Sequence, residues 1–321
     1  MKRKDNLYQE ICKMKHIEFA FNEICRNTEN KRKVYRFKEY KCINLSKIQK
    51  VLEDREYVVG RYIRFKIFEP KERSIVSQEM PDKLVNHLVS RYILMPALMP
   101  CLIDTNVACR IKMGTKKGLQ YYKEFHRKCR IKYDNYYVLK CDISKYFASI
   151  DQETLKAKLR RKIKDRDALK IVFDIIDSEP KGLGIGNMTS QILAVFYLNA
   201  MDHYIKEELK IKYYLRYQDD FILFHPSKEY LKECLEKIKV FLEKEKLTLN
   251  RKTRIFNGRN NFVYLGRSKN SRYAKYRLVN RRIKAKKHLY EVGKIDLQSY
   301  CSTLLSYKFL KNEFRKKMRS E

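Results

Sequence analysis

The sequence lacks the features that membrane-spanning, secreted and zinc-binding proteins need. Its most apolar stretch, residues 92–103, is interrupted by Pro96 and Pro100 and is too short to span a bilayer. The start, MKRKDNLYQE, is charged and no apolar segment follows it, so we expect no secretory signal. The nine cysteines show no C-x-x-C spacing, which argues against zinc and against a disulfide framework. These absences predict a cytosolic protein with reduced thiols.

Acidic residues are also scarce. The chain has 38 Asp and Glu against 73 Lys and Arg, a net charge of +35 that is spread over its whole length. Such a surface attracts polyanions, and nucleic acid is the leading candidate. A membrane surface is the competing polyanion, but we find no strongly amphipathic anchor helix or lipidation motif. With 321 residues, 44% of them hydrophobic, the chain can form a core in one multi-lobed unit or two domains.

The most informative stretch is KYYLRYQDDFILFH, residues 212–225. Apolar and aromatic residues alternate on both sides of Gln218, Asp219 and Asp220, which predicts a β-hairpin with one buried face. Two adjacent carboxylates at its tip repel each other unless a cation lies between them. The pattern therefore indicates a metal site, although a solvated acidic turn is the simpler interpretation.

A third acid, Asp142, ends a nearly continuous apolar run that begins at Tyr136. This run predicts a buried strand that ends at Asp142 and could deliver its carboxylate to a catalytic site. A lone Asp at a strand end is more often a helix N-cap, and Ser144 and Asp151 could cap locally. Further along, PKGLGIGNMTSQ (180–191) is glycine-rich and opens a helix, but no G-K-S/T follows, so it is not a P-loop.

The remaining pattern mixes helices with short strands. A hairpin with many basic residues is expected over 57–76, interrupted at Glu69-Pro70 and resumed at Arg73. We expect a basic loop at 30–33, a basic loop over 101–119, and strands at 247–250 and 254–265 with a turn at Asn257-Gly258. Helices are expected over 6–27, 44–55, 82–95, 152–177, 192–209, 228–246 and most of 267–321.

Taken together, Asp142, Asp219 and Asp220 give the arrangement that a two-metal nucleotidyl transferase needs. Two Mg²⁺ ions roughly 4 Å apart require carboxylates from neighbouring strands, and they keep waters and substrate oxygens as their other ligands. No His or Cys ligand is needed, which agrees with the absence of such clusters.

In this order, the motifs FKIFEPKER, CDISKYFASID, GLGIGNMTSQ, YQDD and FVYLG resemble a reverse transcriptase. IGNMTSQ, YIRFKIFEPKERSI and NVACRIKMGTKKG resemble the enzymes of diversity-generating retroelements in particular. The resemblance implies an α+β right-hand polymerase fold. Its fingers would occupy 1–135, its palm, with an antiparallel sheet, 136–266, and its short helical thumb 267–321.

The resemblance also implies roles for single residues. Asp142, Asp219 and Asp220 would be the catalytic acids, binding two Mg²⁺ ions (or Mn²⁺ as a substitute) with the Ile143 carbonyl as an extra ligand. Phe147 would crowd a ribose 2′-OH and so select dNTPs, although a core aromatic is an equally good interpretation of the residue alone. The other implied residues are Lys66, Arg73 and Gln191 for the dNTP; Gly182, Ile185, Gly186, Asn187 and Ser190 for the base-pair pocket; and Tyr264, Leu265 and Gly266 for the primer grip.

Three positions depart from common reverse transcriptase motifs. Ile185 replaces a Gln, which the resemblance links to low fidelity opposite template adenine. Gly184 replaces a Pro and Gln218 a small or apolar residue, and both touch the base-pair pocket or the primer end. About 55 residues follow residue 266, so we expect no RNase H, endonuclease or integrase domain.

The resemblance implies a bacterial or phage-encoded cytoplasmic enzyme that binds template RNA, primer or cDNA, dNTPs and a small basic accessory protein, without contacting a membrane. Mutagenic retrohoming is the first interpretation. A phage-defence reverse transcriptase making untemplated or repetitive DNA is the second. A non-catalytic RNA-binding protein is the third, and three mutually repelling acids argue against it.

Overall fold

The computed structural model describes residues 3–28, 31–67, 72–260, 263–265, 267–268, 272–297, 299–301 and 303–305. The chain forms two compact units. The first comprises Met1–Ile63 and Val76–Arg259, and the second comprises Arg64–Ile75 and Asn260–Glu321. The expected boundaries at 135 and 266 stay predictions, and each unit is described separately below.

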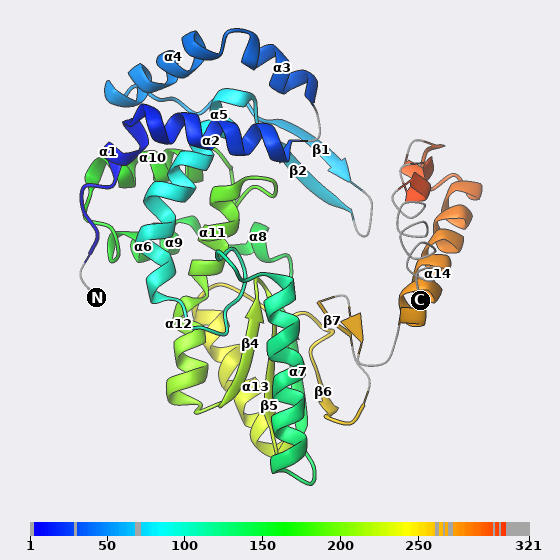
Figure 1. The fold of residues 1–321 in the computed structure, drawn as a ribbon. Helices are drawn as coiled ribbons and strands as arrows, with labels where there is room; N and C mark the ends of the chain where they lie inside the picture. Colours follow the sequence, from blue (N-terminus) through cyan, green and yellow to red (C-terminus); the bar gives the residue numbers. More distant parts are fainter. Residues whose placement is uncertain are drawn as a thin grey trace. The chain divides into compact units, whose positions relative to one another are not determined.

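A four-stranded antiparallel sheet lies in the lower half of the first unit as drawn in Figure 1. The strand that ends at Asp142 and the hairpin around Gln218 are both confirmed. Both hairpin strands are buried on both faces, however, whereas the alternation predicted one solvated face. In spatial order the strands are β4 (Tyr213–Tyr217), β5 (Asp220–His225), β3 (Tyr137–Asp142) and β6 (Arg254–Asn257).

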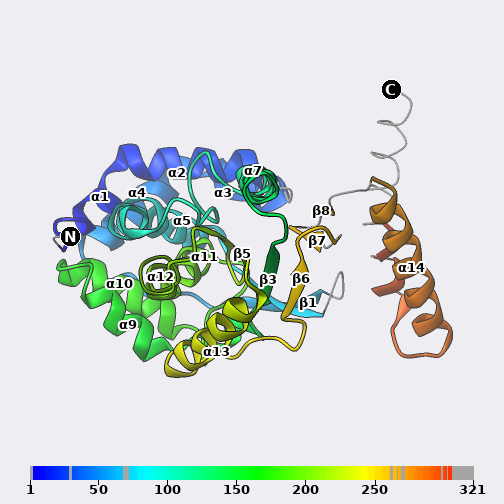
Figure 2. The same cartoon turned by 90° about the horizontal axis from the view of Figure 1, so that it is seen from below.

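Helices cover the two faces of this sheet. α7 (Thr115–Lys132) contacts β4 and β5, where the Phe125 ring lies 5.3 Å from that of Tyr213. α13 (Lys228–Lys244) was expected from its amphipathic pattern and contacts β3 and β5. Figure 2 shows the two helices on opposite sides of the strands. The expectation of a loop over 101–119 was wrong from Thr115 onward, because tertiary packing makes that segment the first turn of α7.

A buried helix is hydrogen-bonded to the hairpin that carries two of the acids, through Arg216 and Gln218. α11 (Met188–Tyr197) follows the glycine-rich segment, and its residues from Ile192 to Tyr197 are all buried. It begins four residues before the expected start at 192, and α12 (Asn199–His203) and a π-helical turn continue it to Glu208. An all-round apolar helix of this kind forms the core of a domain rather than its surface.

The N-terminal helices pack together on the same unit. The expected helix 6–27 is two helices that break at Lys13, and the expected basic loop at 30–33 instead begins a further helix. A π-helical turn precedes Pro96, which has no N–H for an α-helical hydrogen bond. The segments are α1 (Tyr8–Cys12), α2 (Met14–Asn27), α3 (Lys31–Glu39), α4 (Lys41–Glu53), α5 (Met80–Leu88), the π-helical Val89–Leu94, α6 (Met95–Leu98) and the 3₁₀ turn Met99–Cys101.

Two helices within the expected range 152–177 each begin directly after an aspartate. The expected helix 152–177 is divided into α9 (Gln152–Arg160) and α10 (Arg166–Asp177). Asp151 accepts a hydrogen bond from the Thr154 N–H, and Asp165 accepts one from the Ala168 N–H. Each side chain satisfies a backbone donor that the helix leaves unpaired, so the chain starts a new helix at each aspartate.

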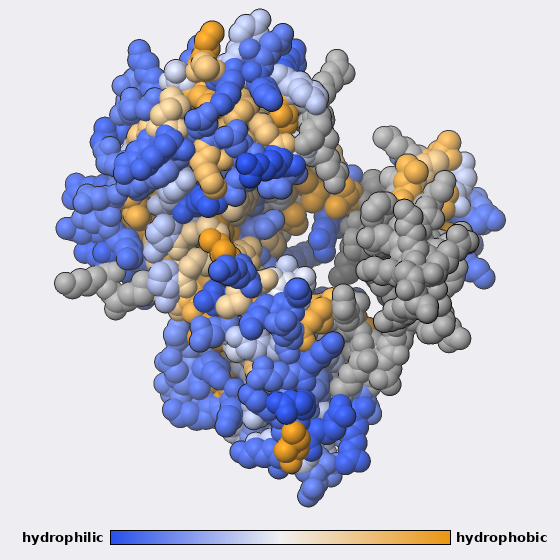
Figure 3. Space-filling view, viewed as in Figure 1, coloured by the Kyte–Doolittle hydropathy of each residue, from blue (hydrophilic) through white to orange (hydrophobic). Residues whose placement is uncertain are grey.

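The surface of the described residues agrees with the high net charge. Figure 3 shows hydrophilic side chains over most of the visible face, with small apolar patches between them. None of the helices in the described ranges is long and apolar enough to cross a membrane.

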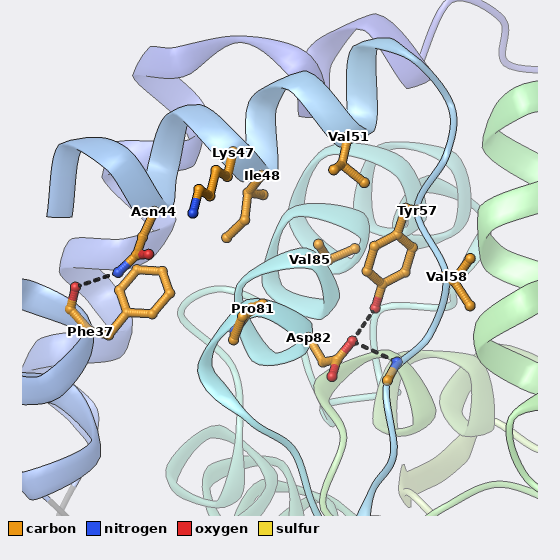
Figure 4. A pocket seen from close by; sticks show the side chains of 11 residues that line it. Phe37, Asn44, Lys47, Ile48, Val51, Tyr57, Val58, Pro81, Asp82 and Val85 are labelled. Atoms are coloured by element: carbon orange, nitrogen blue, oxygen red, sulfur yellow. Dashed lines mark hydrogen bonds between the residues drawn. The ribbon is translucent and has the colours of Figure 1, made fainter. Parts of the chain in front are cut away.

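A pocket of about 360 Å³ lies among α3, α4, α5 and the segment after α4 (Figure 4). Asp82 is 7% exposed and accepts hydrogen bonds from the Tyr57 hydroxyl (2.7 Å) and the Gly60 N–H (3.1 Å). A Cβ atom at Gly60 would lie 2.5 Å from the Asp82 Oδ2 atom. The pocket is lined by residues of the N-terminal part, and none of the three catalytic candidates belongs to it.

The second unit contains short strands and a long basic helix. β1 (Ile63–Ile67) pairs with β2 (Arg73–Ser77), as the hairpin pattern predicted, and Glu69-Pro70 lies outside the described residues. The expected hairpin over 254–265 was wrong, because β6 pairs with β3 while β7 (Val263–Tyr264) pairs with β8 (Arg267–Ser268). The helix expected after 267 is present as α14 (Arg272–Glu291).

Candidate active site

The three acidic candidates lie together at one end of the central sheet. Asp142 is the last residue of β3 and Asp220 the first of β5, and the antiparallel register makes their Cα atoms partners. Asp219 lies directly before Asp220 and is the second residue of the two-residue turn between β4 and β5. The Asn250 N–H donates to the Asp142 carbonyl over 2.7 Å, and Ile143 is bridged to Leu249. The structure thus brings together the acids that the sequence placed in separate motifs.

The electrostatics of this group explain why it needs a cation. Burial, with the charges of Asp142 and Asp219 adding to its effect and Lys140 opposing it, raises the pKa of Asp220 to about 7. The Lys140 ammonium lies 3.6 Å from the Asp220 Oδ2 atom. Sequence reasoning missed Lys140, although its position two residues before Asp142 places it on the same face of β3.

The donor set fits a hard divalent cation. Carboxylate oxygens are the ligands that Mg²⁺ takes, and Mg²⁺ keeps several waters rather than requiring an all-protein cage. Within the described ranges, no three His, Cys, Asp or Glu side chains form a ready-made metal-binding cluster. Asp142, Asp219 and Asp220 would hold such an ion with water and substrate oxygens as its remaining ligands.

The turn that carries Asp219 has an unusual conformation. Gln218 has a φ of 56°, in the left-handed region that a tight hairpin turn requires and that Gly or Asn usually occupies. Its side-chain amide donates to the Cys109 Sγ atom (3.1 Å) and to the Gln191 carbonyl (3.4 Å). The Arg216 guanidinium donates to the Gln218 carbonyl over 2.8 Å. Gln218 therefore touches Gln191, one of the residues implied for the dNTP site.

In the 180–191 segment, Gly182 packs closely against the helix that carries Phe147. Gly182 has a φ of 67°, and a Cβ atom there would lie 2.4 Å from the Phe147 carbonyl oxygen. The Leu183 N–H donates to that same oxygen over 2.8 Å. Phe147 lies in α8 (Tyr146–Ser149), a few residues past Asp142, and is half-buried. Only glycine allows this close approach, so Gly182 fixes the position of the Phe147 backbone.

The other residues of the 180–191 segment that the resemblance singles out differ in how exposed they are. Gly186 and Gln191 are exposed, whereas Asn187 and Ser190 are buried. The Ile185 carbonyl accepts a hydrogen bond from the Val76 N–H over 2.8 Å. Asn187 and Ser190 therefore lie in the core at the start of α11.

Gly184 is explained by its surroundings. A Cβ atom there would lie 2.6 Å from the Glu179 Oε1 atom and 3.2 Å from the Val76 side chain. The proline that the resemblance led us to expect at this position would displace Glu179.

The fingers and primer-grip candidates belong to the second unit. Lys66 on β1 forms an ion pair with Glu72 (2.9 Å), and both side chains are mostly exposed. Arg73 begins β2 and is exposed. Tyr264 is fully buried, Leu265 has a φ of 48°, and Gly266 lies outside the described residues.

Comparison with known protein families identifies the chain. Residues 70–268, more than half of its length, match the family model for reverse transcriptase (RNA-dependent DNA polymerase). The chain belongs to the reverse transcriptase family. The match includes the three acids, the glycine-rich segment and the β7–β8 turn. A comparison with curated proteins finds none that matches.

Solved structures agree with the fold of this family. An apo telomerase from Candida tropicalis, truncated from its C-terminal domain, has a TM-score of 0.50 at 16% identity, covering 66% of this chain and 53% of that one. Telomerase from Candida tropicalis in complex with the TWJ fragment of telomeric RNA has a TM-score of 0.50 at 14% identity, covering 83% and 55%. The chain therefore spans about half the length of these telomerases.

The reverse transcriptase family and these neighbours establish a right-hand polymerase fold of mixed helices and antiparallel sheet. The fold class implied by the motifs is confirmed. The roles assigned to single residues, including the acids, stay predictions.

Proposed function

We propose that this reverse transcriptase is an RNA-directed DNA polymerase that copies a template RNA into cDNA. The observation that carries the proposal is the pairing of Asp142 with Asp220, beside Asp219, at one end of the palm sheet. Mg²⁺ bound by these carboxylates would activate the primer 3′-hydroxyl and neutralise the leaving pyrophosphate.

Each group in the site has a distinct task in this proposal. Asp142, Asp219 and Asp220 hold the metal, and Lys140 offsets part of their charge before metal binds. Phe147, held by Gly182, limits the space beside the sugar of the incoming nucleotide. Lys66 and Arg73 bind its triphosphate.

The basic surface of the chain would bind the template and primer. Phosphate contacts release counterions, so the affinity for nucleic acid should fall steeply with salt.

We further propose that the polymerase serves mutagenic retrohoming in a diversity-generating retroelement of a bacterium or phage. The IGNMTSQ segment supports this, because Ile185 stands where a Gln would contact the base pair. In this setting the enzyme would be cytoplasmic, would act with a small basic accessory protein and would misincorporate opposite template adenine. A template-repeat and variable-repeat pair beside the gene would support the proposal.

A phage-defence role uses the same chemistry for a different product. No described residue favours it over retrohoming, and the product distinguishes the two roles. Defence predicts accurate, untemplated or repetitive DNA, whereas retrohoming predicts templated DNA with errors opposite adenine.

The test is primer extension on an RNA template with Mg²⁺ and each dNTP, followed by sequencing of the products. We expect copying that is faithful except opposite adenine. Accurate or template-free products would contradict the retrohoming proposal and leave the polymerase proposal intact. Absence of synthesis, also with the accessory protein and cognate RNA added, would contradict both.

A further inference from the structure

We infer that Arg216, held by Asp202, is a positioning residue that sets the conformation of the turn bearing Asp219 and Asp220. The inference rests on the proposed polymerase function, because that function gives the turn its task. Neither residue belongs to the motifs that resemble a reverse transcriptase. Arg216 directly precedes YQDD, and Asp202 lies in α12.

Arg216 and Asp202 form a fully buried, bidentate ion pair. Both side chains are 0% exposed. The Arg216 Nε atom donates to the Asp202 Oδ1 atom over 2.7 Å, and its Nη2 atom donates to Oδ2 over 2.6 Å. Two further donors reach backbone carbonyls: Nη2 donates to Val195 of α11 (2.9 Å) and Nη1 to Gln218 of the turn (2.8 Å). The guanidinium thus links two core helices to the turn.

The same pair organises the loop that touches the turn. Asp202 also accepts hydrogen bonds from the Tyr214 hydroxyl (2.6 Å) and from the Asn106 amide (3.1 Å). The Arg216 backbone exchanges hydrogen bonds with Thr105 and Val107, both 3.1 Å long. This loop continues to Cys109, whose sulfur accepts from the Gln218 side chain. The Cys109 loop and α11, which both accept hydrogen bonds from the Gln218 side chain, are therefore each hydrogen-bonded to Arg216 as well.

Stability alone does not explain a buried pair of this kind. Removing two charges from water opposes their attraction, and apolar residues of similar volume often stabilise a fold equally well or better. A buried ion pair does fix directions, because each donor and acceptor requires a partner in one place. In this protein, Arg216 fixes the direction of the Gln218 carbonyl.

Gln218 is the residue that needs this support. Its left-handed conformation is unfavourable for most residues that have a Cβ atom. The hydrogen bond from Arg216 holds the Gln218 carbonyl, and the contacts to Cys109 and Gln191 hold its side chain. Without Arg216 the turn can relax, and Asp219 and Asp220 then lose their orientation toward Asp142.

The decisive variant replaces the pair by apolar residues of similar size, Arg216→Met with Asp202→Leu. Four quantities are measured: the melting temperature, the kcat in primer extension, the KM for dNTP in the same assay, and the Mn²⁺ affinity by electron paramagnetic resonance. The control is Lys158→Met with Glu245→Leu, which removes a mostly buried pair that does not touch the turn. Arg216→Lys keeps the charge but loses the two-pronged geometry.

We expect the Arg216→Met/Asp202→Leu variant to melt within a few degrees of the wild type. Its kcat should fall at least tenfold and its Mn²⁺ affinity should weaken, while the KM for dNTP changes less. The control pair should change only the melting temperature. Arg216→Lys, assayed below its melting temperature, should show the same decreases in kcat and Mn²⁺ affinity. If the double variant does not fold, Arg216→Lys alone tests the inference.

Wild-type kcat and Mn²⁺ affinity in the folded Arg216 variants would overturn the inference. If the wild type itself makes no DNA, the polymerase proposal fails. Mn²⁺ binding then still tests Arg216, because that measurement does not depend on synthesis.

Discussion

Asp142 and Asp220 are direct cross-strand partners at the ends of β3 and β5, although they lie in different motifs of the sequence. The register that pairs them also pairs Val138 with Phe224, Leu139 with Leu223 and Cys141 with Phe221. A slip of one residue would turn every buried side chain of a strand to the other face. The packing of the core therefore keeps the two acids together.

The approach of Gly182 to Phe147 predicts a specific sensitivity to Gly182→Ala. The new Cβ atom would meet the Phe147 carbonyl at 2.4 Å and would also adopt an unfavourable left-handed φ. Gly114 has a φ of 88° with no atom within 4 Å of an added Cβ, so Gly114→Ala measures the conformational effect alone. In denaturant unfolding, Gly114→Ala should lose roughly 1–2 kcal/mol and Gly182→Ala at least about 1 kcal/mol more. Equal losses would show that the contact does not matter.

Replacement of Phe147 tests its assignment as the sugar-selecting residue. Phe147→Ala should raise incorporation of ribonucleotides relative to deoxyribonucleotides at least tenfold, because it opens space beside the 2′-hydroxyl; a tenfold change corresponds to about 1.4 kcal/mol. The control is Tyr146→Phe, which removes only the hydroxyl that donates to the Ala194 carbonyl. If Phe147 is simply a core aromatic, Phe147→Ala will lower stability and leave the nucleotide preference unchanged.

His87 predicts a loss of stability in mild acid. Burial, together with the nearby charges of Lys83 and Arg91, lowers the pKa of His87 from 6.5 to about 4. Between these values the unfolded chain binds a proton that the folded chain does not, so stability is complete above pH 6.5 and falls toward pH 4. The loss should reach roughly 3 kcal/mol in urea unfolding at pH 4 relative to pH 7.

His87→Gln should flatten this dependence, and His203→Gln is the matched control. Hydrogen bonds to the Cys101 carbonyl and Glu207 raise the pKa of His203, so its contribution is lost as the pH rises. Its removal should leave the slope below pH 6.5 unchanged. An unchanged slope in His87→Gln would assign the acid sensitivity to other groups.

The strongest local patterns predicted their elements correctly. The YQDD hairpin and α13 both have clear periodicity, and the run from Tyr136 is bounded by polar residues. α7 was missed because its sequence is rich in basic residues. Only the spacing of the buried Tyr122, Phe125 and Cys129 indicates its inner face, and that face forms against the sheet.

The support of the site could not be predicted from the sequence in the same way. Arg216 lies in a strand that is buried on both faces, although the alternation predicted only one buried face. Its partner Asp202 belongs to another element, and nothing local links the two residues. Lys66 likewise looked like an available base, whereas the structure pairs it with Glu72. Pairings between elements depend on the three-dimensional arrangement, which periodicity does not contain.

The most direct test of the account compares Asp219→Asn with the wild type in Mg²⁺-dependent extension of a DNA primer on an RNA template. Loss of one metal-binding carboxylate should remove several kcal/mol of transition-state stabilisation, a decrease of roughly 10³-fold in rate. Glu236→Gln, which changes an exposed acid on α13, should extend at the wild-type rate. Extension by Asp219→Asn at the wild-type rate would contradict the assignment of Asp142, Asp219 and Asp220 as the catalytic centre.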